Sequence, residues 1–247
     1  MLLPARKIAA ALAAGCPVIS RPASEAPGSC FALGQVLIDA GLPAGVFSIL
    51  TGDPNPMVGD LISSPIIRKV SLTGSVAVGR EILRHCAEGI KKVTMELGGH
   101  APVIVYTDFD PIAAAKKLAT TKFRNCGQVC ISPSRFYVHH SIIEPFAPVA
   151  PITSFDRFEE VIKLANSTPF GLASYLFTHD SALAEQTAQA LESGMVGINE
   201  TLLATAEAPF GGIKESGFGR EGGSLGILDY MVPKYIRHHL AKGSVDV

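Results

Sequence analysis

Charged residues are scarce in this chain of 247 amino acids. They make up 17% of the sequence, and the 21 basic and 22 acidic side chains give a formal net charge of −1, whereas soluble domains average about 25% charged residues. This balance excludes a surface that binds nucleic acid or anionic membrane through charge alone. Because 47% of the residues are hydrophobic, intrinsic disorder is also excluded. We expect a parallel sheet covered on both faces, a large subunit interface, or both.

Long apolar runs and Cys-x-x-Cys pairs are absent too. No run approaches the ~18 apolar residues of a membrane span, so we expect no membrane association. The first sixteen residues resemble a lipoprotein signal ending at Cys16, but Pro-Val-Ile-Ser follows, which favours a strand over a secretion signal. The odd set of cysteines favours free thiols and a cytoplasmic location; they stand at positions 16, 30, 86, 126 and 130.

The first 97 residues alternate between helix and strand patterns, which predicts βαβ units and a parallel sheet. Expected helices span 5–14, 29–40, 57–63 and 73–87, and expected strands span 16–20, 46–50, 69–72 and 93–97. The second half alternates less regularly, with helices over 111–124, 156–165 and 181–193 and strands over 101–106, 135–139, 148–153, 173–178 and 195–199. We expect a glycine-rich loop over 205–226 and an edge strand over 230–240.

Three places could carry chemistry. Gly74 and Ser75 lie between an expected strand and helix, where backbone N–H groups can bind an anion, although these residues alone favour an ordinary turn. Glu96 ends a strand before two glycines and is either a general base or a solvated carboxylate. Cys126 and Cys130 are each either a nucleophile or an inert thiol, and the residues alone do not distinguish between them.

Three motifs, taken together, resemble the aldehyde dehydrogenase superfamily. They are Thr94-Met-Glu-Leu-Gly-Gly99, Phe123-Arg-Asn-Cys-Gly-Gln-Val-Cys130 and the glycine-rich segment 207–222. The resemblance implies an α/β fold with a partial Rossmann-like, parallel-sheet cofactor domain over 1–97 and a shortened α/β catalytic domain over 98–229. It further implies that residues 230–247 form a strand joining a partner subunit in a homo-oligomer, either a dimer or a tetramer.

The resemblance also assigns roles to individual residues. It makes Cys130 the nucleophile and Glu96 the base that activates water. It implies NAD or NADP as cofactor, with no metal site, and the cofactor-binding positions are Arg21, Ser24, Gly74, Ser75, Gly79, Leu97, Glu144 and Phe146. Similarity to succinate-semialdehyde dehydrogenases implies a small aldehyde substrate with a remote carboxylate, and the substrate-binding positions are Arg6, Arg124, Thr205 and Phe210.

The chain departs from this family in length. Members are about twice as long, and the resemblance begins just after the position of the family's oxyanion asparagine. Only 14 positions separate Cys130 from Glu144, where the family has on the order of eighty more. A deletion within Glu-Pro-Phe-Ala, a sequence shared by two family segments, would explain this. The expected function is NAD(P)-dependent oxidation of succinate semialdehyde. The alternatives are a catalytically impaired fragment or pseudo-subunit, and a cofactor-free thiol hydrolase.

Overall fold

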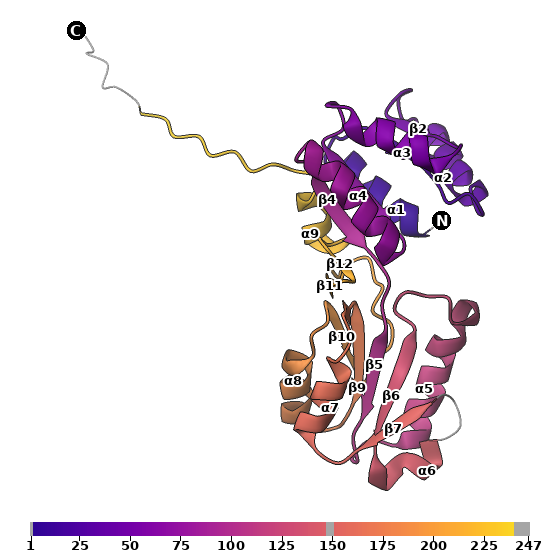
Figure 1. Cartoon of the computed structure of the whole chain (residues 1–247), viewed down its shortest axis with the longest axis vertical. Helices are drawn as coiled ribbons and strands as arrows, with labels where there is room; N and C mark the ends of the chain where they lie inside the picture. Colours follow the sequence, from indigo (N-terminus) through magenta and orange to yellow (C-terminus); the bar gives the residue numbers. More distant parts are fainter. Residues whose placement is uncertain (1, 147–150, 240–247) are drawn as a thin grey trace.

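The computed structural model describes residues 2–146 and 151–239, which form two lobes (Figure 1). The upper lobe in Figure 1 contains the first 96 residues together with a segment near the C-terminus, and the lower lobe is built around one sheet. Within the described ranges, no helix combines the length and apolarity that a membrane crossing requires. The α/β fold expected from the sequence is confirmed.

The lower lobe is a five-stranded, fully parallel sheet whose strand order is β10-β9-β5-β6-β7. Helices α5 and α6 pack on one face and α7 and α8 on the other, and all side chains of β5 and β9 are buried. This arrangement accounts for much of the apolar content, because a parallel strand between two helical layers has no polar face. The elements are β5 (Ala101–Val105), α5 (Pro111–Phe123), β6 (Pro133–His139), α6 (Ile143–Phe146), β7 (Ile152–Phe155), α7 (Phe158–Ala165), β9 (Ala173–Phe177), α8 (Ser181–Ala190) and β10 (Met195–Ile198).

The upper lobe contains the expected helices and strands, but they do not form one sheet. Its elements are α1 (Leu2–Ala13), β1 (Val18–Ser20), α2 (Gly28–Asp39), β2 (Phe47–Ile49), α3 (Pro54–Ser63), β3 (Lys69–Thr73), α4 (Val76–Glu88) and β4 (Lys92–Glu96). Strand β1 pairs in parallel with β2, and β3 with β4. No ladder within the described residues joins the two pairs. The parallel pairing expected from the sequence is therefore present, but it is divided between two sheets.

The glycine-rich segment returns to the upper lobe and is more ordered than the expected loop. It contains β11 (Ile213–Lys214), β12 (Gly217–Phe218) and α9 (Gly223–Leu228). Strand β12 pairs with β4, and β11 pairs with β8 (Phe170–Gly171). Gly217 has φ +112°, and a Cβ there would lie 1.9 Å from the Met95 carbonyl oxygen. The glycine at position 217 therefore allows β12 to lie close to β4.

Two other sequence expectations differ from the structure. The sequence predicts an edge strand over 230–240. Residues 231–239 pair with no strand among the described residues and extend away from both lobes (Figure 1). An extended tail without a neighbouring strand has no ladder to join. The strand expected over 148–153 falls partly on 147–150, outside the described residues, and β7 begins at Ile152.

Candidate active site

Glu96 and Cys130 come together where the two lobes meet. Glu96 is the last residue of β4, and the chain then passes through Gly98 and Gly99 into β5. A Cβ on Gly99 would lie 2.6 Å from the carbonyl oxygen of Cys130, so only glycine fits between the two segments. Burial raises the pKa of the Cys130 thiol, and the charge of Glu96 raises it further. The structure therefore places the carboxylate and the thiol in one site.

The Glu96 carboxylate is buried without a hydrogen-bond partner. The residue is 4% exposed, and neither carboxylate oxygen has a partner among the residues described. Burial raises the pKa of Glu96 to about 7, although the charges of Lys7, Arg220 and Arg6 lower it. A carboxyl group with a pKa near 7 gains and loses a proton at neutral pH, as a general base must.

Cys130 and Cys126 occupy different environments. Cys126 is exposed, whereas Cys130 is partly buried. Burial and the Glu96 charge raise the pKa of the Cys130 thiol, while hydrogen bonds from the backbone N–H groups of Ile131 and Cys130 lower it. Asn125, Cys126 and Gly127 have φ of +51°, +56° and +77°. A positive φ strains the backbone at Asn125 and Cys126, and backbone strain is common at functional sites. The strained turn separates the two thiols and leaves Cys130 beside Glu96.

Lys7 and Glu221 form an ion pair that the sequence analysis did not identify. Glu221 is 5% exposed. Burial lowers the pKa of Lys7 to about 8, while the charge of Glu96 raises it. Lys7 is therefore electrostatically coupled to the carboxylates of both Glu96 and Glu221. Glu221 lies within the glycine-rich motif, so the motif could have indicated it, but the pairing across 214 positions is visible only in three dimensions.

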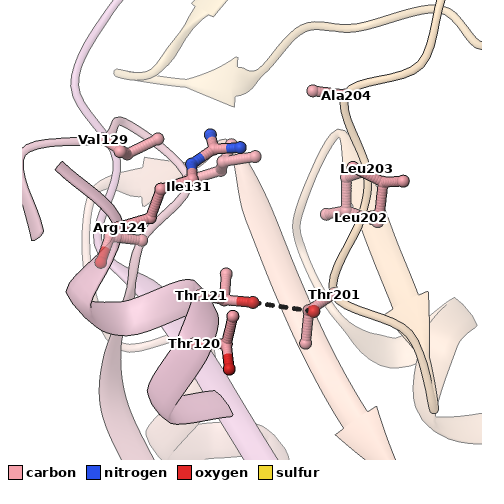
Figure 2. A pocket seen from close by; sticks show the side chains of 10 residues that line it. Thr120, Thr121, Arg124, Val129, Ile131, Thr201, Leu202, Leu203 and Ala204 are labelled. Carbon is pink, nitrogen blue, oxygen red and sulfur yellow. Dashed lines mark hydrogen bonds between the residues drawn. The ribbon is translucent and has the colours of Figure 1, made fainter. Parts of the chain in front are cut away.

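A cavity of about 170 Å³ lies at the turn that contains Cys130, although Cys130 itself is not among its lining residues (Figure 2). Val129 and Ile131, the neighbours of Cys130, line it, and the Arg124 guanidinium projects between its two sides. Thr121 Oγ1 donates a 2.8 Å hydrogen bond to Thr201 Oγ1 across it. The other lining residues are Thr120, Ser132, Leu202, Leu203 and Ala204. One cation in a small, mostly apolar cavity suits a short molecule with a terminal carboxylate.

The remaining expected substrate residues do not line this cavity. The Arg6 guanidinium stacks over the Phe210 ring, 4.5 Å from its centroid, and its charge lowers the pKa of the Cys130 thiol. Phe210 is 4% exposed and belongs to the core. Thr205 follows the lining residue Ala204 but does not itself line the cavity. Arg124 is thus the one of the four expected substrate residues that lines the cavity.

The expected cofactor turn leads into the capped N-terminus of α4, and its Gly74 N–H already donates a 3.1 Å hydrogen bond to the Glu96 carbonyl oxygen. Ser75 caps α4, its Oγ accepting from the Val78 N–H at 3.3 Å, and helix N-termini attract phosphate groups. A Cβ on Gly79 would lie 2.8 Å from the Leu97 side chain, so this glycine allows α4 to approach Leu97. The Thr73 hydroxyl beside the turn is buried and has no partner among the described residues. These features fit a dinucleotide phosphate.

Arg21 and Ser24, at the expected ribose position, lie just after β1 and contact each other. Arg21 Nη2 donates a 2.7 Å hydrogen bond to Ser24 Oγ. No carboxylate takes part in this contact. The pair would therefore present a cation and a hydroxyl to a bound ribose, a combination that does not repel a 2′-phosphate.

Glu144 and Phe146 are not part of this site, contrary to the sequence expectation. They belong to α6, which follows the carboxyl end of β6, whereas Cys130 precedes the amino end of the same strand. Seven residues of β6 separate these ends by roughly 20 Å. Phe146 is 2% exposed and packs against Phe136 in the core. The short connection after β6 thus holds both residues away from Cys130, which does not fit the roles implied for them, Glu144 at a nicotinamide ribose and Phe146 flanking the site.

Comparisons with known proteins agree with the motifs. A sequence model described as "Aldehyde dehydrogenase family" matches residues 1–147 and 143–236. The glutarate-semialdehyde dehydrogenase of Pseudomonas aeruginosa is 35% identical over 314 positions, covering 94% of this chain and 65% of that protein. The NADP-dependent succinate-semialdehyde dehydrogenase of Escherichia coli is 34% identical with the same coverage. The crystal structure of succinate-semialdehyde dehydrogenase from Burkholderia pseudomallei has a TM-score of 0.91 at 35% identity, covering 94% of this chain and 65% of that one.

The match spans about 65% of the length of these curated relatives and has an internal gap. The alignment of 314 positions is longer than the chain of 247 residues, so the relatives contain at least 314 − 247 = 67 positions that this chain lacks within the matched region. The two family matches overlap at residues 143–147, which include the Glu-Pro-Phe-Ala sequence. This finding supports the predicted internal deletion between β6 and β7.

Proposed function

The chain belongs to the aldehyde dehydrogenase family, and from this premise we propose that its site oxidises a small aldehyde to the carboxylic acid with NAD⁺ or NADP⁺ as oxidant. The observation that carries the proposal is the buried Glu96 carboxylate, unpartnered among the described residues, beside the Cys130 thiol. A buried carboxylate without a hydrogen bond is costly for a fold. A proton-transfer role in catalysis gives a reason for keeping it.

The chemistry of this chain's own residues follows from their placement. The Cys130 thiol loses its proton and attacks the aldehyde carbon, and the backbone N–H groups that face the sulfur lie close to the oxyanion that forms. A bound NAD(P)⁺ would accept the hydride that converts this adduct to a thioester. Glu96 then takes a proton from water as the water oxygen attacks the thioester carbon, the C–S bond breaks, and Cys130 leaves as a thiolate together with the acid, so that the proton stays on Glu96. Lys7, coupled to Glu96 and Glu221, gives this proton a route away from the base.

We propose a semialdehyde with a remote carboxylate as the substrate. Arg124 is the cation of the cavity beside Cys130, and a guanidinium pairs well with a carboxylate. Two relatives are named glutarate- and succinate-semialdehyde dehydrogenase, in agreement with this chemistry. Replacing Arg124 with Met is expected to raise the KM for succinate semialdehyde by roughly tenfold or more, because a charged hydrogen bond contributes about 1.5–3 kcal/mol. The KM for an uncharged aldehyde of similar length should change little.

The decisive experiment is a spectrophotometric assay of NAD(P)⁺ reduction by the full chain with succinate semialdehyde. Cys130→Ala should lower any activity at least ~10³-fold, since it removes the nucleophile. Cys126→Ala is the matched control and should retain activity within about twofold, because that thiol is exposed. Equal loss in both variants, or activity that survives Cys130→Ala, would refute the proposal.

A second candidate is a catalytically impaired member of the family. The internal gap between β6 and β7 and the two unjoined sheets of the upper lobe favour it. Such a chain would bind NAD(P)⁺ weakly and reduce none of it. A cofactor-free thiol hydrolase would cleave activated esters through Cys130 whether or not NAD(P)⁺ is present, so an ester assay with and without cofactor distinguishes the three functions.

A further inference from the structure

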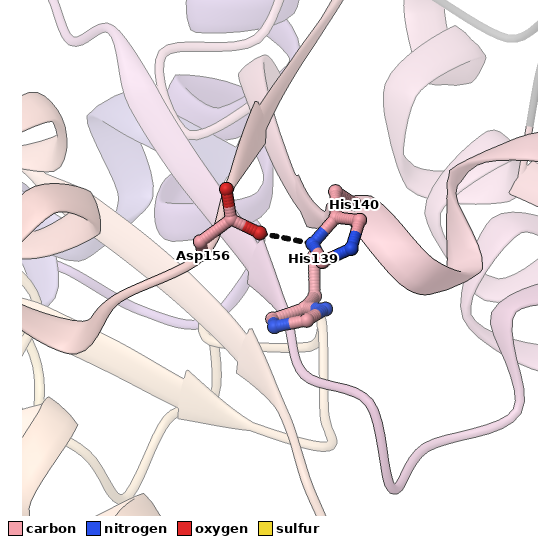
Figure 3. Close-up of side chains that lie close together, drawn as sticks. All are labelled: His139, His140 and Asp156. Atoms are coloured by element: carbon pink, nitrogen blue, oxygen red, sulfur yellow. Dashed lines mark ion pairs between the residues drawn. The ribbon is translucent and has the colours of Figure 1, made fainter.

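A second group of ligating side chains lies at the opposite end of the lower sheet from Cys130. It consists of His139, His140 and Asp156, and one potential ligand atom from each lies within 4.8 Å of the others (Figure 3). His139 is the last residue of β6, and it pairs in register with Phe155, the last residue of β7. The parallel pairing therefore brings His140 and Asp156, which follow these two residues, to one corner of the sheet.

The three side chains are accessible and held in place by their neighbours. The side chains of His140 and Asp156 are 62% and 64% exposed and form an ion pair. His139 Nδ1 lies 2.9 Å from Ser141 Oγ and 3.3 Å from the Ser141 backbone nitrogen, so Nε2 is the ring nitrogen left to bind a metal ion, in the tautomer whose Nδ1–H donates to Ser141 Oγ. The His139 ring packs edge-on against Phe155, with centroids 5.5 Å apart. The Asp156 N–H donates to Glu160 Oε2 at 3.3 Å, which fixes the backbone of the third residue.

We propose that His139, His140 and Asp156 form a binding site for one divalent transition metal ion, best suited to Zn²⁺. Two imidazoles and one carboxylate make up a ligand set that zinc uses in proteins, with water in the fourth position. Mg²⁺ and Ca²⁺ prefer sets made mainly of oxygen atoms. The sequence analysis expected no metal site, because the ligands come from two segments that only the β6–β7 pairing joins.

The position of the site gives it a structural consequence. Strand β7 is at the edge of the sheet and pairs only with β6 among the described strands. The two family matches meet at residues 143–147, so the positions that relatives have in addition fall between His140 and Asp156. This chain has a short connection where its relatives have those additional positions. A metal ion bound here would link the edge strand β7 to β6 at the ends of that connection.

The test is a calorimetric titration of the full, metal-free chain with Zn²⁺, together with the visible absorption of bound Co²⁺. We expect one ion per chain. His140→Ala and Asp156→Asn should each weaken binding by more than about tenfold, since loss of even a second-shell partner costs 10–100-fold. Both positions are exposed, so folding should be retained, which circular dichroism checks. Zn²⁺ should also raise the melting temperature of the chain but not that of either variant.

Two controls separate this site from other exposed histidines. His85 pairs with Glu81 at 3.3 Å and is similarly exposed, but the pair belongs to no three-ligand group in the part of the chain described. The tail carries His238 and His239. His85→Ala and the double variant His238→Ala/His239→Ala should bind Zn²⁺ within about twofold of the unmodified chain. Unchanged affinity in His140→Ala and Asp156→Asn, loss of binding in the tail variant, or equal affinity for Mg²⁺ would overturn the proposal.

Discussion

The two lobes differ in how completely their sheets are covered. In the lower lobe, all side chains of β5 and β9 are buried between two helical layers. In the upper lobe, no side chain of β1, β2 or β3 is fully buried, three of the five residues of β4 are buried, and the strands form a separate pair and a three-stranded sheet. Since buried apolar area is the main source of folding free energy, the lower lobe should be the more stable of the two.

This difference divides the proposed site. The proposed nucleophile Cys130 and the cavity around Arg124 belong to the well-packed lower lobe. The base Glu96, the charges that tune it and the Gly74–Ser75 turn belong to the upper lobe. Catalysis needs these groups held within fractions of an ångström, so the packing of the upper lobe limits what the site can do. The comparison can be tested by substitutions that probe each lobe.

The largest effect should come from two matched isoleucines. Ile104 in β5 is 0% exposed, whereas Ile49 in β2 is half-buried. We expect Ile104→Ala to lower the free energy of unfolding by about 2–5 kcal/mol, as buried truncations do. Ile49→Ala should lower it by less than about 1.5 kcal/mol, since less apolar area is lost. Urea unfolding of both variants measures this difference.

The contrast also has a local readout. Amide hydrogen exchange should be slower by at least about a hundredfold in β5 and β9 than in β1 and β2, because the upper strands can open without unfolding the whole chain. Equal costs of the two alanine substitutions, or equal protection of the two sets of strands, would show that the lobes fold as one unit of uniform stability.

The next effect concerns Glu96, whose buried carboxylate should destabilise the chain when it is charged. Its pKa in the folded state is about 7, raised chiefly by burial, whereas the unfolded value is near 4.3. Between these values the folded state binds more protons than the unfolded state, so this group makes stability fall as pH rises and then level off above about 7. Glu96→Gln should therefore raise the free energy of unfolding by about 1–3 kcal/mol at pH 8.

The pH dependence provides the control for this substitution. At pH 4 both residues are neutral, so Glu96→Gln and the unmodified chain should differ by less than about 0.5 kcal/mol in unfolding free energy. Urea titrations at the two pH values measure both quantities. The electrostatic explanation predicts a gain only where Glu96 is charged. A gain in stability at pH 4 as large as that at pH 8 would therefore contradict it.

Sequence patterns predicted most elements because each depends on local residue types. Alternating apolar segments located β5 and β9, and the family motifs indicated Cys130 and Glu96 before their proximity was visible. The same patterns failed where long-range pairing decides the outcome. The residues around Gly217 have the composition of a loop. They form a strand because Gly217, which has no Cβ, can lie close to the Met95 carbonyl oxygen in β4. Glu144 and Phe146 matched a motif but lie at the wrong end of β6.

The ion pair of Lys7 and Glu221 shows the same limit. Its members are separated by 214 positions, and no local pattern connects α1 to the segment that precedes α9. Their burial, and therefore their effect on Glu96, depends on how the glycine-rich segment returns to the upper lobe. Residue spacing carries no information about such a contact. The family motif supplies only one of the two partners, since Glu221 lies inside it and Lys7 does not.

The smallest expected effect tests whether the upper lobe tunes the base. The charge of Lys7 lowers the pKa of Glu96, while burial raises it to about 7. Lys7→Gln removes that charge, raises the pKa of Glu96 and should move the ascending acidic limb of the pH profile, measured as ester hydrolysis by Cys130, to higher pH. The rate at pH 7 should fall by less than about tenfold, which corresponds to less than one pKa unit.

Lys69→Gln is the matched control, because Lys69 is also a partly buried lysine of the upper lobe but pairs with Asp229, and its charge is not among those that act on Glu96. An equal shift in both variants would assign the effect to general loss of packing, whereas a shift confined to Lys7→Gln would show that the ionisation of Glu96 depends on the ordered structure of the upper lobe.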